Sequence, residues 1–166
     1  SNFNIKQIQR ILDTCSIKPD NLQNESHLYL QEPELVRFCQ KNAIAMTSYS
    51  SLGTKGSREL MGMSWTNKSL PEMLENAILV KIAKRYNKTP AQVLLRFIIQ
   101  KGVSVIPKST NPQRIVENIR IFDFKLDSNE MKTLLGQDAG EGGRIVRFLF
   151  FPEITEHPEY PFLVQK

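Results

Sequence analysis

Short strand-like runs alternate with helical stretches along this chain, and this alternation limits the fold more than any other feature. Residues 19–25, 43–49 and 103–106 have strand character, although the polar side chains of the first run disfavour it. Helical patterns lie between and after these runs. Strands separated by helices form parallel sheets, because the helix carries the chain back to the same end of the sheet. The sequence therefore predicts an α/β protein with parallel strands.

The helices are predicted from apolar periodicity and from the signals at their ends. They are expected at residues 4–13, 33–40, 71–86, 89–101, 111–118 and 127–135. The sharpest signal is Thr89, which is followed by Pro90 and Gln92 and so predicts a capping box with proline at the first helical position. Gly102 is expected to end that helix, since glycine suits the turn after a helix C-terminus.

The length of 166 residues suits one domain. Only three strands can be counted, whereas a closed parallel barrel needs eight strands and roughly 250 residues. The pattern alone leaves two folds open, a small open sheet or part of a barrel. Because the chain begins at Ser1 rather than at Met, we expect it to come from a longer protein.

Composition narrows the class of protein. The 22 Lys and Arg against 17 Asp and Glu give a net charge of +5, which favours anionic ligands without establishing nucleic-acid binding. The two cysteines, Cys15 and Cys39, cannot form a disulfide framework, and this favours a reducing compartment. No apolar stretch approaches the ~18 residues of a membrane span, and no signal peptide is visible. We therefore expect a cytoplasmic protein without nucleic-acid or membrane partners.

The clearest chemical signal lies at residues 106–114, where a strand ends and a helix begins. Lys108, Ser109 and Thr110 directly follow the strand, and Arg114 lies in the first turns of the helix. Ligands of α/β proteins bind at this end of the strands, and a helix N-terminus favours an anion. These residues predict a phosphate site, with a solvated turn of ordinary surface charges as the alternative.

Other polar residues give weaker signals. Tyr49 ends a predicted strand, where its ring could stack on a planar ligand, although a tyrosine of the core or rim is the simpler interpretation. Gln23 and Asn24 could hydrogen-bond an amide or could simply serve a turn. The glycines of residues 140–143 follow no strand, so they predict a flexible tail.

No metal site or nucleophilic centre is predicted. His27 and His157 are isolated and lack metal-ligand spacing with cysteine, so each is expected to be packed or solvated. No nucleophile elbow, Walker loop or zinc signature is present.

Taken together, these residues resemble the carboxyl-terminal half of the aldo-keto reductase family. The motifs that carry the resemblance are S-N-F at residues 1–3, Q-N-E-S-H at 23–27, Y-S-S-L-G at 49–53, and I-P-K-S at 106–109 with Arg114, Glu117 and Asn118. The resemblance implies part of an (α/β)8 TIM barrel, roughly strands six to eight with their helices. Residues 1–166 would form this half-barrel, and residues 137–166 would be the tail that shapes the substrate pocket.

The resemblance also implies an NADP(H) site. Ser1, Asn2 and Gln23 would hold the nicotinamide carboxamide. Tyr49 would stack on the nicotinamide ring and so determine which face gives hydride.

The resemblance assigns the phosphates and the adenine as well. Ser50 and Leu52 would lie beside the pyrophosphate, in a turn that Ser51 should loosen because it replaces the usual proline. The residues implied for the 2′-phosphate are Lys108, Ser109, Thr110 and Arg114, and those for the adenine are Glu117 and Asn118. The 2′-phosphate is a dianion that suits the predicted cationic site, so NADPH is favoured over NADH.

The implied activity is the reduction of an aldehyde or ketone, a small-molecule carbonyl substrate, by hydride from NADPH. In the family a tyrosine supported by lysine, aspartate and histidine donates the proton, and no residue of this chain matches those positions. No catalytic residue is therefore assigned, and the chain alone is expected to be inactive. Two alternatives remain open: a non-catalytic NADP(H)-binding module, or a fragment that is not stable alone. The full-length protein is expected to be monomeric.

Overall fold

The computed structural model describes residues 1–54, 70–148 and 153–162. Its elements follow one another as α1 (Ile5–Thr14), β1 (Asn21–Glu25), α2 (Pro33–Lys41), β2 (Ala45–Tyr49), the 3₁₀ turn η2 (Met73–Glu75), α4 (Ala77–Tyr86), α5 (Pro90–Gln100), β3 (Ser104–Val105), α6 (Pro112–Ile119), α7 (Ser128–Leu135), and the 3₁₀ turns η3 (Gly140–Gly143) and η4 (Ile154–Glu156).

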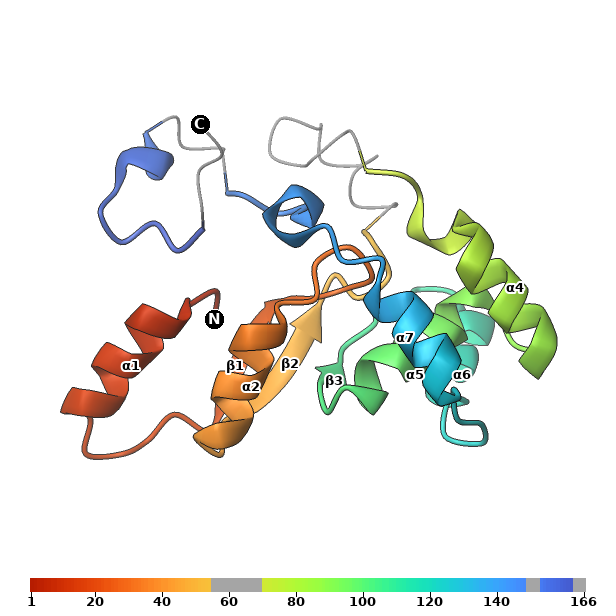
Figure 1. Ribbon diagram of the computed structural model, residues 1–166, viewed down its shortest axis with the longest axis horizontal. Coiled ribbons are helices and arrows are strands. Elements are labelled where there is room, and N and C mark those ends of the chain that lie inside the picture. Colours follow the sequence, from red (N-terminus) through yellow and green to blue (C-terminus); the bar gives the residue numbers. More distant parts are fainter. Residues whose placement is uncertain (55–69, 149–152, 163–166) are drawn as a thin grey trace.

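The strands form one parallel sheet in the order β1-β2-β3 (Figure 1). The pairing of β1 with β2 runs from Asn21 opposite Ala45 to Glu25 opposite Tyr49. The carboxyl ends of these strands therefore share one edge of the sheet. The predicted α/β fold with parallel strands is confirmed.

The third strand is shorter than predicted. Of residues 103–106, only Ser104 and Val105 form β3 and pair with β2. Pro107 follows closely and lacks the N–H that a longer ladder would need. The chain consequently leaves the sheet early and reaches α6 through an exposed turn.

The two faces of the sheet differ in polarity. Leu22 and Met46 are buried, and α2 and α5 lie against the sheet. On the other face, Thr47 Oγ1 lies 2.9 Å from both Asn21 Oδ1 and Ser104 Oγ. Alternation of side chains along a strand produces this division, with one apolar face for the helices and one polar face left open.

The predicted helix ends are confirmed at α1 and α5. Asn4 Oδ1 accepts a hydrogen bond from the Gln7 amide at 2.9 Å, and Thr89 caps α5 through a reciprocal box with Gln92. Gly102 has a φ of +80° directly after α5. Six residues of α5 are buried and include Phe97, so this helix contributes much of the core.

The predicted helix at 71–86 is wrong in its first part. The structure has the short turn η2 and then α4, which begins only after Asn76. The Asn76 side chain accepts hydrogen bonds from the amides of Ile78 and Leu79, which is how an asparagine starts a helix. Leu74, expected on the apolar face, is therefore 36% exposed.

The glycine-rich segment is also ordered, against the prediction of a flexible tail at 140–143. It forms η3, and Gly143 lies so close to Tyr29 that an added Cβ would stand 1.8 Å from the Tyr29 carbonyl oxygen. The Ala139 amide donates to the same oxygen at 2.9 Å. Figure 1 shows the chain after α7 crossing back over the sheet toward α1.

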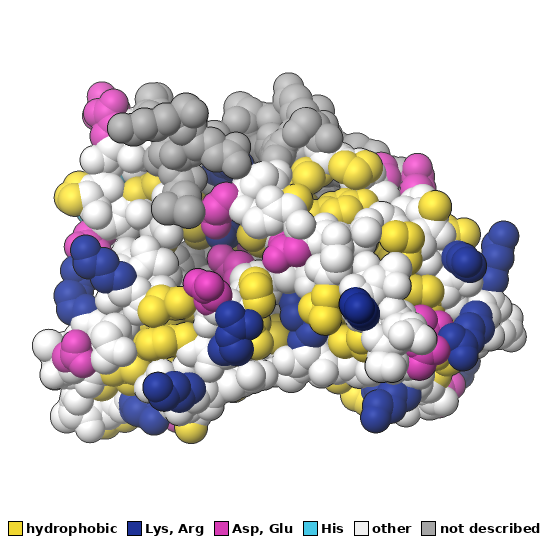
Figure 2. Space-filling model, viewed as in Figure 1, with side chains coloured by type: hydrophobic (Ala, Val, Ile, Leu, Met, Phe, Trp, Pro, Cys, Tyr) yellow, Lys and Arg dark blue, Asp and Glu magenta, His cyan; other side chains and the backbone are white. Residues whose placement is uncertain are grey.

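Charged side chains are dispersed on the face drawn in Figure 2, where Lys and Arg alternate with Asp and Glu around a shallow hollow. Over the part of the chain that the structure describes, no helix has the length and apolar character to cross a membrane.

Candidate functional site

The predicted nicotinamide residues meet at the end of β1. Ser1 Oγ donates to the Gln23 carbonyl oxygen at 2.5 Å, and the Asn2 amide donates to the same oxygen at 3.1 Å. The Asn2 amide also reaches Asn24 Oδ1 at 2.8 Å, and Asn2 has a φ of +61°. The structure thus brings Ser1, Asn2 and Gln23 together, with the Gln23 carbonyl oxygen as the shared acceptor.

Tyr49 joins this group from the end of β2. Its hydroxyl donates to Asn2 Oδ1 at 2.7 Å. Burial first, and then the charge of Glu25, raises the pKa of Tyr49 above the ordinary tyrosine value, so the hydroxyl stays protonated. The half-buried ring stands at the edge where ligands of parallel sheets bind.

The turn after β2 is closed by hydroxyl groups. Ser48 Oγ and Ser51 Oγ lie 2.7 Å apart, and Ser51 Oγ donates to the Ser48 carbonyl oxygen at 3.1 Å. Ser51 is buried. Ser50, with a φ of +55°, and Leu52 are half-buried beside it. Residues 55–69, which follow this turn, lie outside the described residues.

The predicted phosphate site lies in the turn between β3 and α6. Asn111 caps α6 by accepting from the Arg114 amide at 3.1 Å, and Ser109 Oγ accepts from the Asn111 amide at 3.2 Å. Lys108, Thr110 and Arg114 are exposed. This turn presents two cations and two hydroxyls around the start of a helix, which is a setting that favours an anion.

The cations of this turn are available to a ligand. Among the ion pairs of the described residues, none involves Lys108 or Arg114. Glu117 and Asn118 lie half-buried farther along α6, and Glu117 Oε1 accepts from Gln113 at 3.0 Å.

A cavity of about 220 Å³ lies where the start of the chain meets its carboxyl-terminal segment. Ser1, Asn2, Phe148 and Tyr160 are among its lining residues. The edge that carries the predicted nicotinamide residues thus adjoins a pocket with aromatic walls from the tail.

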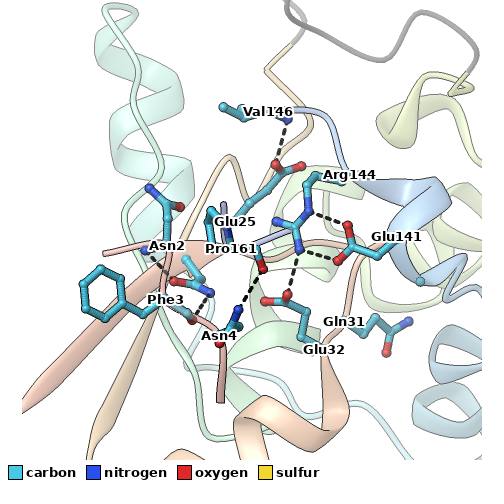
Figure 3. Close-up of polar contacts among 12 residues, drawn as sticks. Asn2, Phe3, Asn4, Glu25, Gln31, Glu32, Glu141, Arg144, Val146 and Pro161 are labelled. Atoms are coloured by element: carbon cyan, nitrogen blue, oxygen red, sulfur yellow. Dashed lines mark hydrogen bonds and ion pairs between the residues drawn. The ribbon is translucent and has the colours of Figure 1, made fainter. Parts of the chain in front are cut away.

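Sequence reasoning missed the charged groups that hold this segment in place. Arg144, with a side chain only 2% exposed, forms ion pairs with Glu141 at 2.6 Å and with Glu32 at 2.8 Å (Figure 3). Burial alone would lower the pKa of Arg144, but the hydrogen bonds and charges of these glutamates outweigh it, and the pKa is raised. The Arg144 guanidinium also lies 3.9 Å from the centre of the Phe162 ring. No local pattern signals the pairing with Glu32, because the two residues are 112 positions apart in the sequence.

Glu25 belongs to the Q-N-E-S-H motif at residues 23–27, and the sequence alone predicts no role for it. Its buried carboxylate accepts from the Val146 amide at 2.8 Å (Figure 3) and lies 2.7 Å from His27 Nε2. His27 is packed, in agreement with the sequence. The described residues contain no group of three or more side chains suited to a metal ion, and Cys15 and Cys39 are both free.

The parallel sheet is consistent with the comparison to known proteins. Residues 1–137 match the model of the aldo/keto reductase family, and the chain belongs to this family.

Three relatives show the range of similar proteins. Aldo-keto reductase family 1 member D1 of Oryctolagus cuniculus is 44% identical over 164 residues, which are 98% of this chain and 47% of that protein. Rho crystallin of Aquarana catesbeiana is 42% identical, and prostaglandin F synthase 1 of Bos taurus is 40% identical; in both, 98% of this chain matches 48% of the relative. The chain spans about half the length of these relatives.

A solved structure supports the same fold. The structure of the aldose reductase from Schistosoma japonicum matches with a TM-score of 0.81 and 37% identity, over 99% of this chain and 47% of that one. The three-stranded parallel sheet with its helices is consistent with part of a TIM barrel. The assignment to strands six to eight stays a prediction.

Proposed function

We propose that this chain forms the NADP(H)-binding part of an enzyme that reduces aldehydes or ketones to alcohols. The observation that carries the proposal is the pair of exposed cations in the turn that leads into α6 and in its first turn, which form no ion pair with any described residue, in a chain of the aldo/keto reductase family. The order of the four motifs supports a position in the carboxyl-terminal half of the barrel. On this proposal residues 1–166 are one half-barrel, with 137–166 as its substrate loop.

The 2′-phosphate would be held by Lys108 and Arg114, with hydroxyl groups from Ser109 and Thr110. The residues fit this group, because both cations are free of ion pairs with described residues and the α6 N-terminus adds a partial positive charge. Arg114 offers a forked donor and Lys108 a point charge, a combination suited to a phosphate dianion.

The adenine would lie along α6, beside Glu117 and Asn118. Both side chains are half-buried, and an amide and a carboxylate suit the donor and acceptor groups of a purine edge. The pyrophosphate would pass Ser50 and Leu52, in the turn that the Ser51 hydroxyl closes.

The nicotinamide would occupy the edge at the ends of β1 and β2. Ser1, Asn2 and Gln23 would bind its carboxamide, and the ring of Tyr49 would orient it. Asn2 Oδ1 accepts from the Tyr49 hydroxyl and has a second lone pair, which could accept from the NH2 group of the carboxamide.

When bound, NADPH supplies a hydride to the carbonyl carbon of the substrate. The contribution of this chain is to hold the cofactor and, through Phe148 and Tyr160, to exclude water from the adjoining pocket. No residue of this chain is proposed as the proton donor.

The test is to mix the protein with NADPH and a series of aldehydes and ketones while following the absorbance of NADPH. We expect substrate-dependent oxidation of NADPH by the full-length protein that contains this chain, and binding of NADPH without oxidation by residues 1–166 alone. Tight binding of NADPH by the full-length protein without oxidation of any carbonyl would instead support the second candidate, a non-catalytic NADP(H)-binding module. The name of one relative, a crystallin, shows that not every similar protein is named for an enzymatic activity.

A further inference from the structure

The carboxylate of Glu25 is completely buried at the end of β1 and directed at the carboxyl-terminal segment. Its Oε1 accepts from the Ile145 amide at 2.6 Å, and its Oε2 accepts from the Val146 amide at 2.8 Å. These bonds join residues 120 and 121 positions apart in the sequence. A buried carboxylate is costly unless several donors satisfy it.

His27 supplies the third donor. Its Nε2 lies 2.7 Å from Glu25 Oε1, and both side chains are completely buried. The Tyr29 amide donates to His27 Nδ1 at 3.3 Å, so Nδ1 acts as acceptor and the proton lies on Nε2, facing Glu25. All three donors around Glu25 thus point a proton at its carboxylate. If glutamine replaced Glu25, its NH2 group, which is itself a donor, would face at least one of these donors.

The segment that Glu25 holds forms one wall of the pocket beside the proposed nicotinamide edge. Phe148 and Tyr160 line the pocket opposite Ser1 and Asn2. Both rings pack on Phe162, with ring centres 6.1 Å and 5.4 Å away. The wall is therefore an aromatic cluster rather than separate side chains.

Other contacts hold the segment to the outer helices instead of to the sheet. The Pro161 carbonyl oxygen accepts a hydrogen bond from Asn4 Nδ2 at 3.2 Å (Figure 3). Glu159 pairs with Arg10 at 2.8 Å on an exposed surface. Arg144 pairs with Glu32 at the start of α2. Only Glu25 connects the segment, among the described hydrogen bonds, to a strand that carries a proposed cofactor residue.

We propose that Glu25 is a positioning residue, which fastens residues 144–148 to the end of β1 and thereby fixes the aromatic wall of the substrate pocket relative to the nicotinamide. The inference deepens the proposed function and rests on it. It predicts that loss of Glu25 affects the carbonyl substrate more than the cofactor, because the predicted cofactor contacts are made by other residues.

The test compares Glu25→Gln with Glu130→Gln. Glu130 is a matched control, because it is also buried and also accepts three hydrogen bonds, from Arg85, Tyr86 and the Asp127 amide, far from the proposed site. Amide hydrogen exchange at Ile145 and Val146 is measured in both variants. The KM for a carbonyl substrate, kcat and the Kd for NADPH are measured with the same substitutions in the full-length protein, because residues 1–166 alone are expected to be inactive.

In Glu25→Gln we expect exchange of the two amides to accelerate about tenfold or more, because one buried donor loses its acceptor. The KM should rise about tenfold, with kcat within about threefold and the Kd for NADPH within about twofold of the wild type. Glu130→Gln should leave the exchange of the two amides, the KM, kcat and the Kd for NADPH near those of the wild type, although it lowers overall stability.

Unchanged exchange at Ile145 and Val146 in Glu25→Gln, or an equal rise in KM in both variants, would overturn the inference. Failure of the wild-type protein to bind NADPH would overturn the proposed function instead, and is seen without any variant. If Glu25→Gln does not fold, Glu25→Asp replaces it, since it keeps the charge and withdraws the carboxylate by one methylene. The same split between KM and Kd is expected there, and its absence would equally refute the role of Glu25.

Discussion

The Tyr49 hydroxyl donates a hydrogen bond to Asn2 Oδ1 over 2.7 Å and thereby ties the end of β2 to the start of the chain. Both residues belong to the predicted nicotinamide site, and neither helical nor strand pairing requires their contact. The bond holds the Tyr49 ring in one orientation at the sheet edge. A preformed orientation lowers the entropy that a ligand must overcome on binding.

Substitution of Tyr49 should separate the role of its ring from that of its hydroxyl. Tyr49→Phe keeps the ring and should raise the Kd for NADPH by about fivefold or less, because it removes one hydrogen bond. Tyr49→Ala also removes the stacking surface and should raise the Kd for NADPH by about a further tenfold, because an aromatic contact contributes roughly 1 kcal/mol or slightly more. Fluorescence titration with NADPH measures both. Equal affinities of the two variants would contradict a stacking role.

The close approach of Gly143 to Tyr29 predicts a large cost for a single methyl group. In Gly143→Ala the new Cβ would stand 1.8 Å from the Tyr29 carbonyl oxygen, so the backbone must move. We expect a loss of about 2–4 kcal/mol in the free energy of unfolding, measured with urea. Gly136→Ala is the control, because its nearest neighbour is 3.5 Å away and its φ is −68°. It should change stability by less than about 1 kcal/mol, and a similar loss in both variants would refute this account of Gly143.

Lys101 should make stability depend on pH. Burial, opposed by the charges of Asp138 and Glu32, lowers the pKa of Lys101 from 10.5 to about 8. Between these two pH values the unfolded chain binds a proton that the folded chain does not, so the free energy of unfolding rises with pH through this window. Below the window Lys101 is charged in the folded chain too, and the full cost of burying that charge is present.

The comparison that tests this is Lys101→Met, which removes the titrating group. From about pH 8 to about pH 10, the wild type should gain about 2 kcal/mol of unfolding free energy relative to the variant. Tyrosines that also titrate near pH 10 are common to both proteins and cancel in the difference. Parallel pH profiles would show that Lys101 keeps its ordinary pKa.

The sequence predicts best where a structural feature depends on residues close together in the chain. The capping box at Thr89 and the end of α5 at Gly102 are local, and both are confirmed. The apolar periodicity predicts a helix from residue 71, whereas α4 begins only after its cap, Asn76. Here the local hydrogen bonds of an asparagine outweigh the periodicity of the apolar residues.

Contacts between distant segments could not be predicted in the same way. Arg144 pairs with Glu32, which lies 112 positions away, and Gly143 is required by a carbonyl more than a hundred positions away. Nothing in residues 140–144 marks this packing. At the candidate site, Tyr49 and Asn2 were predicted from the family resemblance, whereas the hydrogen bond between them is visible only in the structure.

The affinity for NADPH and NADH, measured in the wild type, Lys108→Met and Arg114→Met, tests the central claim most directly. We predict that each variant weakens NADPH binding by about tenfold or more, the cost of a charge-assisted hydrogen bond, and changes NADH binding by less than about twofold. Lys125→Met, which removes an exposed charge outside the turn, should alter neither. Equal loss of both cofactors, or unchanged affinity for NADPH, would contradict the assignment of this turn to the 2′-phosphate.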